Sequence, residues 1–368
     1  MAAPTPNEAD RLARRVLTSR VMLKPGENVT IETYPTALPW ALGFVREARR
    51  LGARPLLHYE DEDSYWAAVD EGRFDLLGQP GRHEWAALEN TAVYVYFWGP
   101  EDRARRERLP AVTADRLVAF NPKWYRVAGR HRVRGVRMGI AHVTPLAARQ
   151  WGVPFGAWQK EVVRSTMLDP ADLVADAKKV RRAFERGREV RIRHPNGTDL
   201  ALALAGHTPL LSLGRTTPAT RRQAFGSMAN APDGSVYVAV DATTADGALV
   251  SNRLSSRLGV PVRGGQWTFR RGHLVRQRYS EGAGAMRRAW RSAGRYRDRP
   301  AMVEVGLDPT VRIAPGLEEN ERGSVTVGIG GNAGFGGTTP ARLYMHLSVA
   351  GAELSVDGRV LVRGGRVV

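Results

Sequence analysis

The chain has 368 residues, of which 43% are hydrophobic and 25% charged, proportions typical of a globular protein long enough for two domains. It contains no cysteine, which excludes disulfides, thiolate nucleophiles and thiolate-bound metals. No apolar run reaches the roughly 20 residues that cross a bilayer, and the N-terminus has alternating charge instead of an apolar signal segment. We therefore expect a cytoplasmic protein with no membrane partner.

The net charge of +18 comes almost entirely from arginine, because only five of the 55 basic residues are lysine. The arginines gather in residues 103–108, 126–137 and 270–299. This bias fits a GC-rich genome and a solvated surface as well as selection for an acidic partner, such as an acidic peptide or nucleic acid. No zinc finger, RNA-recognition motif or leucine zipper accompanies the charge, so nucleic acid is a partner supported by charge alone.

The first half alternates helical and strand patterns. Apolar residues at helical spacing predict helices over residues 7–19 and 39–51. Apolar, β-branched and aromatic runs predict strands over residues 29–33, 54–59, 91–98, 116–120 and 137–141. Strands that flank a helix form right-handed crossover units of a parallel sheet. We expect residues 1–186 to form an α/β domain, with a parallel or mixed sheet covered by helices on both faces.

The second half is rich in glycine and short strands. A helix over residues 170–186, opened by Asp169 as N-cap, marks the domain boundary, and one more helix is predicted over residues 283–293. The strands are predicted over residues 189–193, 200–205, 235–240, 248–251, 267–270, 302–306, 324–329, 343–349 and 359–362. We expect residues 187–368 to form a mostly β, α+β domain with mixed or antiparallel pairing.

Six short motifs follow one another in this second half. They are Gly197-Thr198-Asp199-Leu200, Asn230-Ala231-Pro232-Asp233-Gly234, Glu304-Val305-Gly306, the segment from Gly323 to Gly330, His346-Leu347-Ser348 and Val356-Asp357-Gly358. Their order and spacing resemble the aminopeptidase T family of dinuclear metallopeptidases. The resemblance covers most of the chain, and it implies an α/β domain followed by a β-rich domain that carries the site, and a homodimer.

The metal ligands that the resemblance implies are only partly present. Where the family has glutamate, histidine and aspartate ligands, this chain has the hydroxyl residues Ser235, Thr326 and Ser348. Glu304 and His346 match the family. Neutral hydroxyls are poor ligands for divalent ions, and two ligands out of five should not hold a pair of metals. We expect no metal, no other cofactor and no dinuclear aminopeptidase activity.

Two interpretations of Glu304 and His346 remain open. They form either a catalytic acid and base or a buried pair that is hydrogen-bonded to neighbouring hydroxyls. In the first case the substrate contacts four polar residues, Ser235, Thr326, Ser348 and Asn332 of the glycine-rich segment.

A mononuclear metal site is the alternative to a metal-free site. It would hold zinc, manganese or cobalt through Glu304, His346 and one further carboxylate. The carboxylates nearest in sequence to the motifs are Asp233, Asp241, Asp246, Glu281 and Asp308. Each of them also suits a turn or a helix cap, so none is preferred.

Three functions follow from these patterns. The first is a protein that binds or modifies a peptide, acidic peptides included, in a role such as the maturation of a peptide natural product. The second is a hydrolase with the mononuclear metal site described above. The third is a basic nucleic-acid-binding protein, which rests on charge alone.

Overall fold

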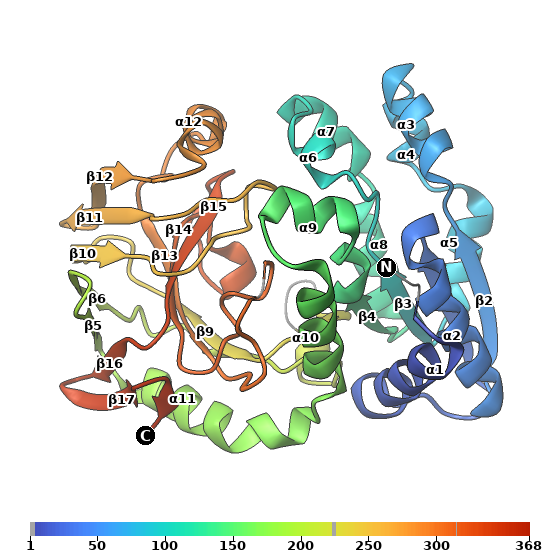
Figure 1. Cartoon of the computed structure of the whole chain (residues 1–368), viewed down its shortest axis with the longest axis horizontal. Helices are drawn as coiled ribbons and strands as arrows, with labels where there is room; N and C mark the ends of the chain where they lie inside the picture. The colour runs from blue at the N-terminus through green and yellow to red at the C-terminus, as the bar shows by residue number, and fades with distance from the viewer. Residues whose placement is uncertain (1–3, 223–225, 314) are drawn as a thin grey trace. The chain divides into compact units, whose positions relative to one another are not determined.

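The computed structural model describes residues 4–222, 226–313 and 315–368 (Figure 1). The chain divides into two compact units. The first comprises Met1–Pro170 and Gly214–Pro232, and the second comprises Ala171–Leu213 and Asp233–Val368. Within the described residues, no helix has the length and apolar character needed to span a membrane.

A five-stranded parallel sheet forms the centre of the first unit. Its strands lie in the order β2-β1-β3-β4-β8, with bounds β1 (Asn28–Thr33), β2 (Arg54–Tyr59), β3 (Val93–Phe97), β4 (Arg134–Met138) and β8 (Met228–Ala231). Each neighbouring pair is parallel. The middle strand β3 is a run of apolar and aromatic residues, as expected of a parallel strand that is buried on both faces.

Helices cover both faces of this sheet, as the sequence predicts. Their bounds are α1 (Pro6–Arg15), α2 (Leu38–Arg50), α3 (Glu62–Asp70), α4 (Phe74–Leu77), α5 (Arg82–Glu89), α6 (Arg103–Glu107), α7 (Ala111–Leu117), α8 (Asn121–Arg130), α9 (Pro145–Trp151) and α10 (Phe155–Met167). Phe44 of α2 packs on Phe97 of β3, with ring centroids 5.2 Å apart. Trp124 of α8 packs on Tyr94 of β3, also at 5.2 Å. Because residues 94 and 97 point to opposite sides of a strand, the two helices lie on opposite faces.

The last strand of the first sheet comes from a returning segment of the chain, residues 214–232. Arg20, which is 1% exposed and ends a π-helical turn after α1, ties this segment down. Its guanidinium donates to the carbonyls of Gly214 at 3.0 Å, Thr166 at 2.9 Å and Leu168 at 3.1 Å. The observed division differs from the predicted boundary near residue 186. The chain leaves the first unit after residue 170 and returns to it once, for residues 214–232.

The second unit contains two antiparallel sheets and two helices. The eight-stranded sheet has the order β12-β11-β10-β6-β5-β16-β17-β18, and the five-stranded sheet has the order β15-β14-β13-β9-β7. The bounds are β5 (Glu189–His194), β6 (Thr198–Ala203), β7 (Leu210–Ser212), β9 (Ser235–Ala239), β10 (Asp246–Val250), β11 (Gln266–Arg270), β12 (His273–Arg278), β13 (Pro300–Gly306), β14 (Val325–Gly330), β15 (Tyr344–Val349), β16 (Glu353–Val356), β17 (Arg359–Arg363), β18 (Arg366–Val367), α11 (Val174–Arg186) and α12 (Ala283–Ser292).

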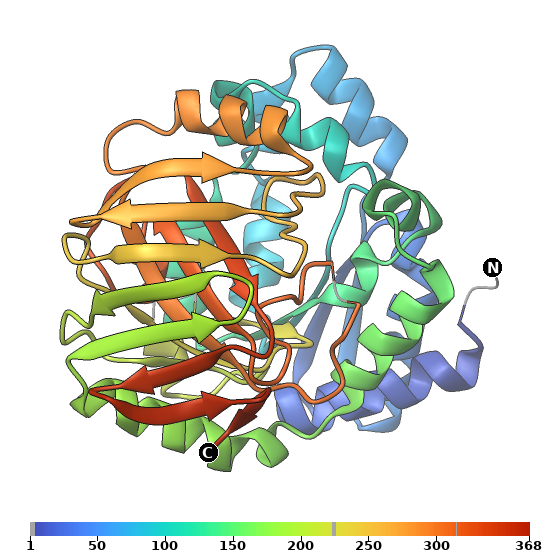
Figure 2. The same cartoon turned by 60° about the vertical axis from the view of Figure 1, so that its left-hand side comes forward.

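The two sheets of the second unit pack face to face (Figure 2). Trp267 and Phe269 of β11 and Leu347 of β15 belong to the core between them. A Cβ atom on Gly265, just before β11, would lie 2.5 Å from the Leu347 side chain, so glycine permits close approach at this point. The helix α11 contacts β7, β9 and β18.

Three predicted elements differ from the structure. Residues 116–120 are no strand, because α7 extends to Leu117, whose side chain packs with the α3 residues Tyr65, Trp66 and Val69. The predicted strand over residues 137–141 begins three residues earlier, since pairing with β3 starts at Arg134. The α-helix predicted from residue 170 begins at Val174 after a 3-10 turn, and Leu173, rather than Asp169, is its N-cap.

Replacing Arg20 by methionine tests the tie that closes the first unit. Arg20→Met retains the buried chain length but leaves several carbonyls without a donor, so we expect the free energy of unfolding to fall by about 3 kcal/mol. Urea titration followed by tryptophan fluorescence measures this change. Arg49→Met, at an exposed position of α2, is the matched control and should change stability by less than about 0.5 kcal/mol. Equal effects of the two substitutions would contradict this role of Arg20.

Candidate functional site

A row of polar side chains crosses the five-stranded sheet of the second unit. Tyr237 pairs with Glu304, Glu304 pairs with Thr326, and Thr326 pairs with Ser348. Paired residues of antiparallel strands share a face, so these four side chains point to the same side. The alternate residues are apolar and fully buried on the other face: Val236, Val238, Val303, Val305, Val325, Val327, Leu347 and Val349. We call the first side the polar face.

Every predicted ligand position lies on this polar face. Ser235 is two residues from Tyr237, and His346 is two residues from Ser348, so both side chains share the face of the polar row. The structure therefore brings together Glu304 and His346 with the three hydroxyl residues that replace family ligands.

Two of those hydroxyls satisfy each other. The Oγ1 of Thr326 and the Oγ of Ser348 are 2.7 Å apart, and both residues are buried. The Ser348 carbonyl accepts a further hydrogen bond from Ser251 Oγ at 2.8 Å. A histidine and an aspartate at these two positions would offer metal ligands, whereas this pair offers a closed hydrogen bond.

His346 is completely buried and is bonded on both ring nitrogens. Its Nδ1 accepts from Arg257 Nε at 3.4 Å and lies 3.4 Å from the hydroxyl of Tyr344. Its Nε2 lies 3.2 Å from Oε1 of Glu318. Because a guanidinium can only donate, Nδ1 must be the acceptor, and the imidazole proton lies on Nε2, where it is donated to Glu318.

Glu318 accepts this hydrogen bond from His346, and two backbone N–H groups hold its carboxylate in place. Its Oε1 accepts from the backbone N–H of Ser256 at 2.7 Å, and its Oε2 accepts from that of Gly316 at 2.8 Å. Burial works against the charged form, but the hydrogen bond from His346, followed by those from the backbone donors, holds the pKa of Glu318 below its usual value. The residue is therefore a carboxylate paired with an N–H donor.

Glu319 has an unused acceptor at the same place. Its Oε2 is buried without a hydrogen-bond partner and lies 3.8 Å from His346 Nε2, while Oε1 faces Arg257 at 3.4 Å. One ligand atom from each of Glu318, Glu319 and His346 falls within 4.8 Å of the other two. An unpaired buried carboxylate oxygen calls for a cation or a hydrogen-bond donor.

Glu304 titrates in the opposite direction from Glu318. Burial, and then the nearby charge of Glu319, raise the pKa of Glu304 well above its usual range. The Ser235 hydroxyl approaches Glu304 and opposes this rise, but it forms no hydrogen bond of ordinary geometry. The pKa shifts of these two carboxyl groups therefore favour the neutral acid at Glu304 and the carboxylate at Glu318.

Two glycines make room for this arrangement. A Cβ on Gly306 would lie 2.2 Å from the Glu321 carbonyl and 2.5 Å from that of Glu319, so glycine lets the loop after β13 cross the end of the strand. A Cβ on Gly328 would lie 2.7 Å from the ring of Tyr344. The glycines of the Glu-Val-Gly and Gly323–Gly330 motifs thus position the neighbours of His346.

Aromatic rings line one side of the polar face. Phe335 packs against Tyr344 with centroids 4.7 Å apart and edge-on against Tyr237 at 5.3 Å. Asn332, predicted to bind substrate, accepts from the N–H of Thr339 at 2.6 Å and donates to the Ala301 carbonyl at 3.3 Å. Both ends of its side chain hold the loop that carries Phe335.

The five carboxylates suggested from sequence as a third ligand have other partners. Asp233 accepts from Ser212 Oγ, Asp241 from the Thr243 N–H, Asp246 from the Arg271 N–H, Glu281 from Arg263, and Asp308 from the Thr310 N–H. Asp241 and Asp308 make short-range turn contacts, and Asp246 and Glu281 make exposed contacts, whereas Asp233 is buried against another strand. The cluster that the described residues form around His346 instead uses Glu318 and Glu319.

Sequence reasoning missed four residues of this site: Arg257, Glu318, Glu319 and Tyr344. Glu318 and Glu319 lie in the loop between the Glu-Val-Gly motif and Gly323, where the family pattern gives no position to compare. Their only signal is an acidic run, Glu318-Glu319-Asn320-Glu321, between two motifs of an otherwise basic chain. Arg257 carried no local signal among so many arginines.

The donor set does not fit a dinuclear centre. Thr326 and Ser348 are bonded to each other, which leaves Glu304 and His346 as the matching ligands. A single ion between Glu318, Glu319 and His346 would have enough ligand atoms, but the proton on Nε2 of His346 prevents this nitrogen from binding it. A histidine binds metal through a lone pair, and Arg257 keeps the proton on the nitrogen that faces the two carboxylates.

No family model matches the chain, and no curated protein matches it either. Two solved structures resemble its fold over nearly the whole length. Wild-type AmpT from Thermus thermophilus superposes with a TM-score of 0.71 and 19% identity, covering 98% of this chain and 99% of that one. The 2,5-dihydroxypyridine dioxygenase from Pseudomonas putida KT2440 gives 0.62 and 13%, covering 99% and 98%. The predicted aminopeptidase T-like fold is thus confirmed.

Removing Arg257, which donates to Nδ1 of His346, tests whether the proton on Nε2 prevents metal binding. In Arg257→Met the imidazole is free to move its proton to Nδ1, and the Nε2 lone pair then faces two carboxylates. We expect zinc to bind about tenfold more tightly or better than to the wild type, and cobalt to give the visible absorption of a bound ion. Competition with a chromophoric chelator measures the affinity.

Arg263→Met is the matched control, because it removes the same charge from a residue whose partner is the exposed Glu281. Nitrogen-15 NMR of the wild-type imidazole should show the proton on Nε2. A proton on Nδ1, or equal zinc affinity in the two variants, would contradict the assignment.

The raised pKa of Glu304 predicts a pH dependence of stability. The folded chain keeps a proton that the unfolded chain releases near pH 4.5, so this stabilisation is complete below that value and is lost as the pH rises toward the folded-state pKa. In Glu304→Gln the side chain is neutral at every pH, so its stability does not fall for this reason as the pH rises. We expect its unfolding free energy, relative to the wild type, to increase steadily from pH 4.5 to pH 8 in urea titrations. The exposed Glu71→Gln control should show no such trend, and a flat difference for Glu304→Gln would show that Glu304 is not protonated.

Proposed function

We propose that the protein binds a peptide through its N-terminal ammonium group, without metal, on the polar face of the second unit. The observation that carries this proposal is the buried Oε2 of Glu319, which lacks a hydrogen-bond partner beside His346. An ammonium group is a cation with three N–H donors, and it suits a carboxylate oxygen of this kind.

The position of the His346 proton, on Nε2, favours an ammonium ligand over a metal ion. A metal ion needs the Nε2 lone pair, whereas an ammonium group needs only the free oxygen of Glu319 and leaves the Arg257–His346–Glu318 chain intact. The Glu319 side chain is 15% exposed although Oε2 itself is buried, so the ligand has to displace the groups that cover this oxygen. The aromatic rings of Phe335 and Tyr344 would then lie near the first side chains of the peptide.

The fold supports a peptide as the ligand, since it is shared with AmpT. A modifying step is also within the reach of the site, because Glu304 holds a proton and the paired Glu318 and His346 hold another. Such a step would be non-hydrolytic maturation of a peptide product. A homodimer, as the resemblance implies, is part of the proposal and is tested by light scattering of the purified protein.

A mononuclear metal site is the second candidate. It is favoured by the ligand atoms of Glu318, Glu319 and His346, which all lie within 4.8 Å of one another. The ion would then bind Oε2 of Glu319, the oxygen to which we assign the ammonium group in the first proposal. It would supply Lewis-acid chemistry, and Glu318 and Glu319 would neutralise its charge.

Isothermal titration with a short peptide, in the presence of a chelator, separates these candidates. We expect binding by the free N-terminus, loss of about tenfold or more when the peptide is N-acetylated, and a similar loss in Glu319→Gln. Metal analysis of the purified protein should find far less than one ion per chain.

Glu353→Gln is the matched control, because Glu353 pairs with Arg363 on the surface of the same unit and its loss should leave binding unchanged. Stoichiometric zinc, manganese or cobalt that disappears in Glu319→Gln would replace this proposal by the second candidate. Peptide binding that ignores acetylation would overturn the ammonium assignment.

A further inference from the structure

The helix α12 presents an arginine-rich surface that the polar face does not use. Arg287, Arg288 and Arg291 are exposed on this helix, and Arg295 is exposed just after it. Residues 287 and 291 follow at helical spacing, and residue 288 lies beside them. The helix buries only Met286, so most of its surface faces away from the core.

These arginines have no carboxylate partner among the described residues, since none of the ion pairs found there includes them. The one acidic residue between Gly282 and Arg299 is Asp298, and it is bound to His273 at 2.6 Å. In each of the other two arginine-rich segments, one arginine has a carboxylate partner. Arg105 pairs with Asp70 at 2.6 Å, and Arg134 pairs with Glu27. A genomic arginine bias alone does not explain why the α12 cluster has no counter-charge.

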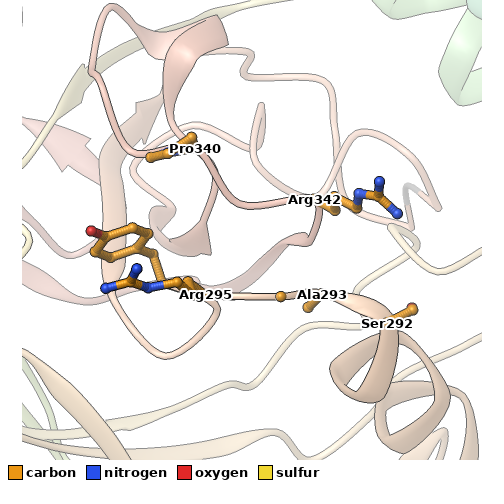
Figure 3. Close-up of a pocket in the computed structure, with 7 residues that line it drawn as sticks. Ser292, Ala293, Arg295, Pro340 and Arg342 are labelled. Atoms are coloured by element: carbon orange, nitrogen blue, oxygen red, sulfur yellow. The ribbon is translucent and has the colours of Figure 1, made fainter.

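A depression of about 490 Å³ adjoins the end of this helix (Figure 3). It is lined by Ser292, Ala293, Gly294, Arg295, Tyr296, Pro340 and Arg342. Arg295 and Arg342 come from two different loops, which are joined where the Arg342 N–H donates to the Ala293 carbonyl at 3.3 Å. None of these residues takes part in the His346 network. Guanidinium groups in a small concave site favour bidentate binding of carboxylate or phosphate.

The aromatic residues of this region are already covered by guanidinium groups. Arg295 lies over the ring of Tyr296 at 5.5 Å, and Arg297 lies over Trp290 at 5.2 Å. Tyr296 is 41% exposed and has a φ of 64°, in the left-handed region that a tyrosine rarely adopts. This strained backbone holds Tyr296 at the rim of the depression beneath Arg295.

We propose that Arg287, Arg288, Arg291, Arg295 and Arg342, with the depression beside Tyr296, form a docking surface for a carboxylate-rich segment of a polypeptide. We call it the α12 surface. It is a second binding site on the unit that carries the polar face. The proposal stands independently of what His346 and Glu319 do.

Peptide is favoured over nucleic acid for three physical reasons. Proteins that bind single strands stack bases on open aromatic faces, and Arg295 and Arg297 already occupy a face of each ring here. The helix has only 10 residues, or about 15 Å of length, which matches a few residues of extended peptide. The depression accommodates side chains rather than a duplex backbone.

Fluorescence anisotropy with an N-acetylated oligoglutamate tests this surface, because acetylation removes the ammonium group that the polar face would bind. We expect salt-sensitive binding that weakens about tenfold in the triple variant Arg287→Gln, Arg288→Gln, Arg291→Gln. The matched control, Lys178→Gln, Lys179→Gln, Arg182→Gln, removes the same charge from exposed positions of α11 and should bind like the wild type. Arg342→Gln, outside the helix, should also weaken binding and serves if the triple variant fails to fold.

Two results would overturn the proposal. Equal losses in the two triple variants would show unspecific attraction to net charge. An oligothymidylate of the same charge that binds more tightly than oligoglutamate, and loses affinity in the α12 variant, would make the surface a nucleic-acid site. Glu319→Gln should bind oligoglutamate like the wild type, so failure of the ammonium proposal and failure of this one are distinguishable.

Discussion

The alternation of side chains along four antiparallel strands is the constraint on which the second unit depends. Each of β9, β13, β14 and β15 must send one set of residues into the core between the sheets and the other set to the polar face. A shift of one residue in β13 or β14 would bury Glu304 or Thr326 among valines. The hydroxyl residues Ser235, Thr326 and Ser348 fit this alternation as well as larger polar side chains would, so the fold does not depend on carboxylate or imidazole groups at these positions.

Within that frame, the protonation of one buried cluster decides what it can bind. Arg257 fixes the proton of His346 on the side of Glu318, and this proton compensates the Glu318 charge. Burial, and then the nearby charge of Glu319, raise the pKa of Glu304 and so favour its neutral form. Carboxyl groups with opposite pKa shifts on one face are a common basis of acid and base roles. Arg257 and Glu319 matter as much here as the residues that match the family.

The sequence predicts this architecture well wherever local pattern decides the structure. Alternation and spacing placed β13, β14, β15 and α12 within two residues. The motifs with Glu304 and His346 fall on β13 and β15, which lie on either side of β14 in one sheet. Glu318 could not be found, because its role depends on the Ser256 N–H and on His346, which are distant in sequence. Strand β8 was missed for a similar reason: its four residues are stable only beside β4.

The course of the chain through the first unit has a consequence for its synthesis. The parallel sheet ends in β8, which leaves the ribosome after the first strands of the second unit have been made. Arg20 can donate to the Gly214 carbonyl only after residue 214 has been synthesised, 194 residues later. Until then, the Arg20 side chain lacks one of the acceptors that it has in the folded protein. The exposed edge of β4 must stay free of other strands throughout this interval, and vectorial folding of the first unit is complete only once the second is under way.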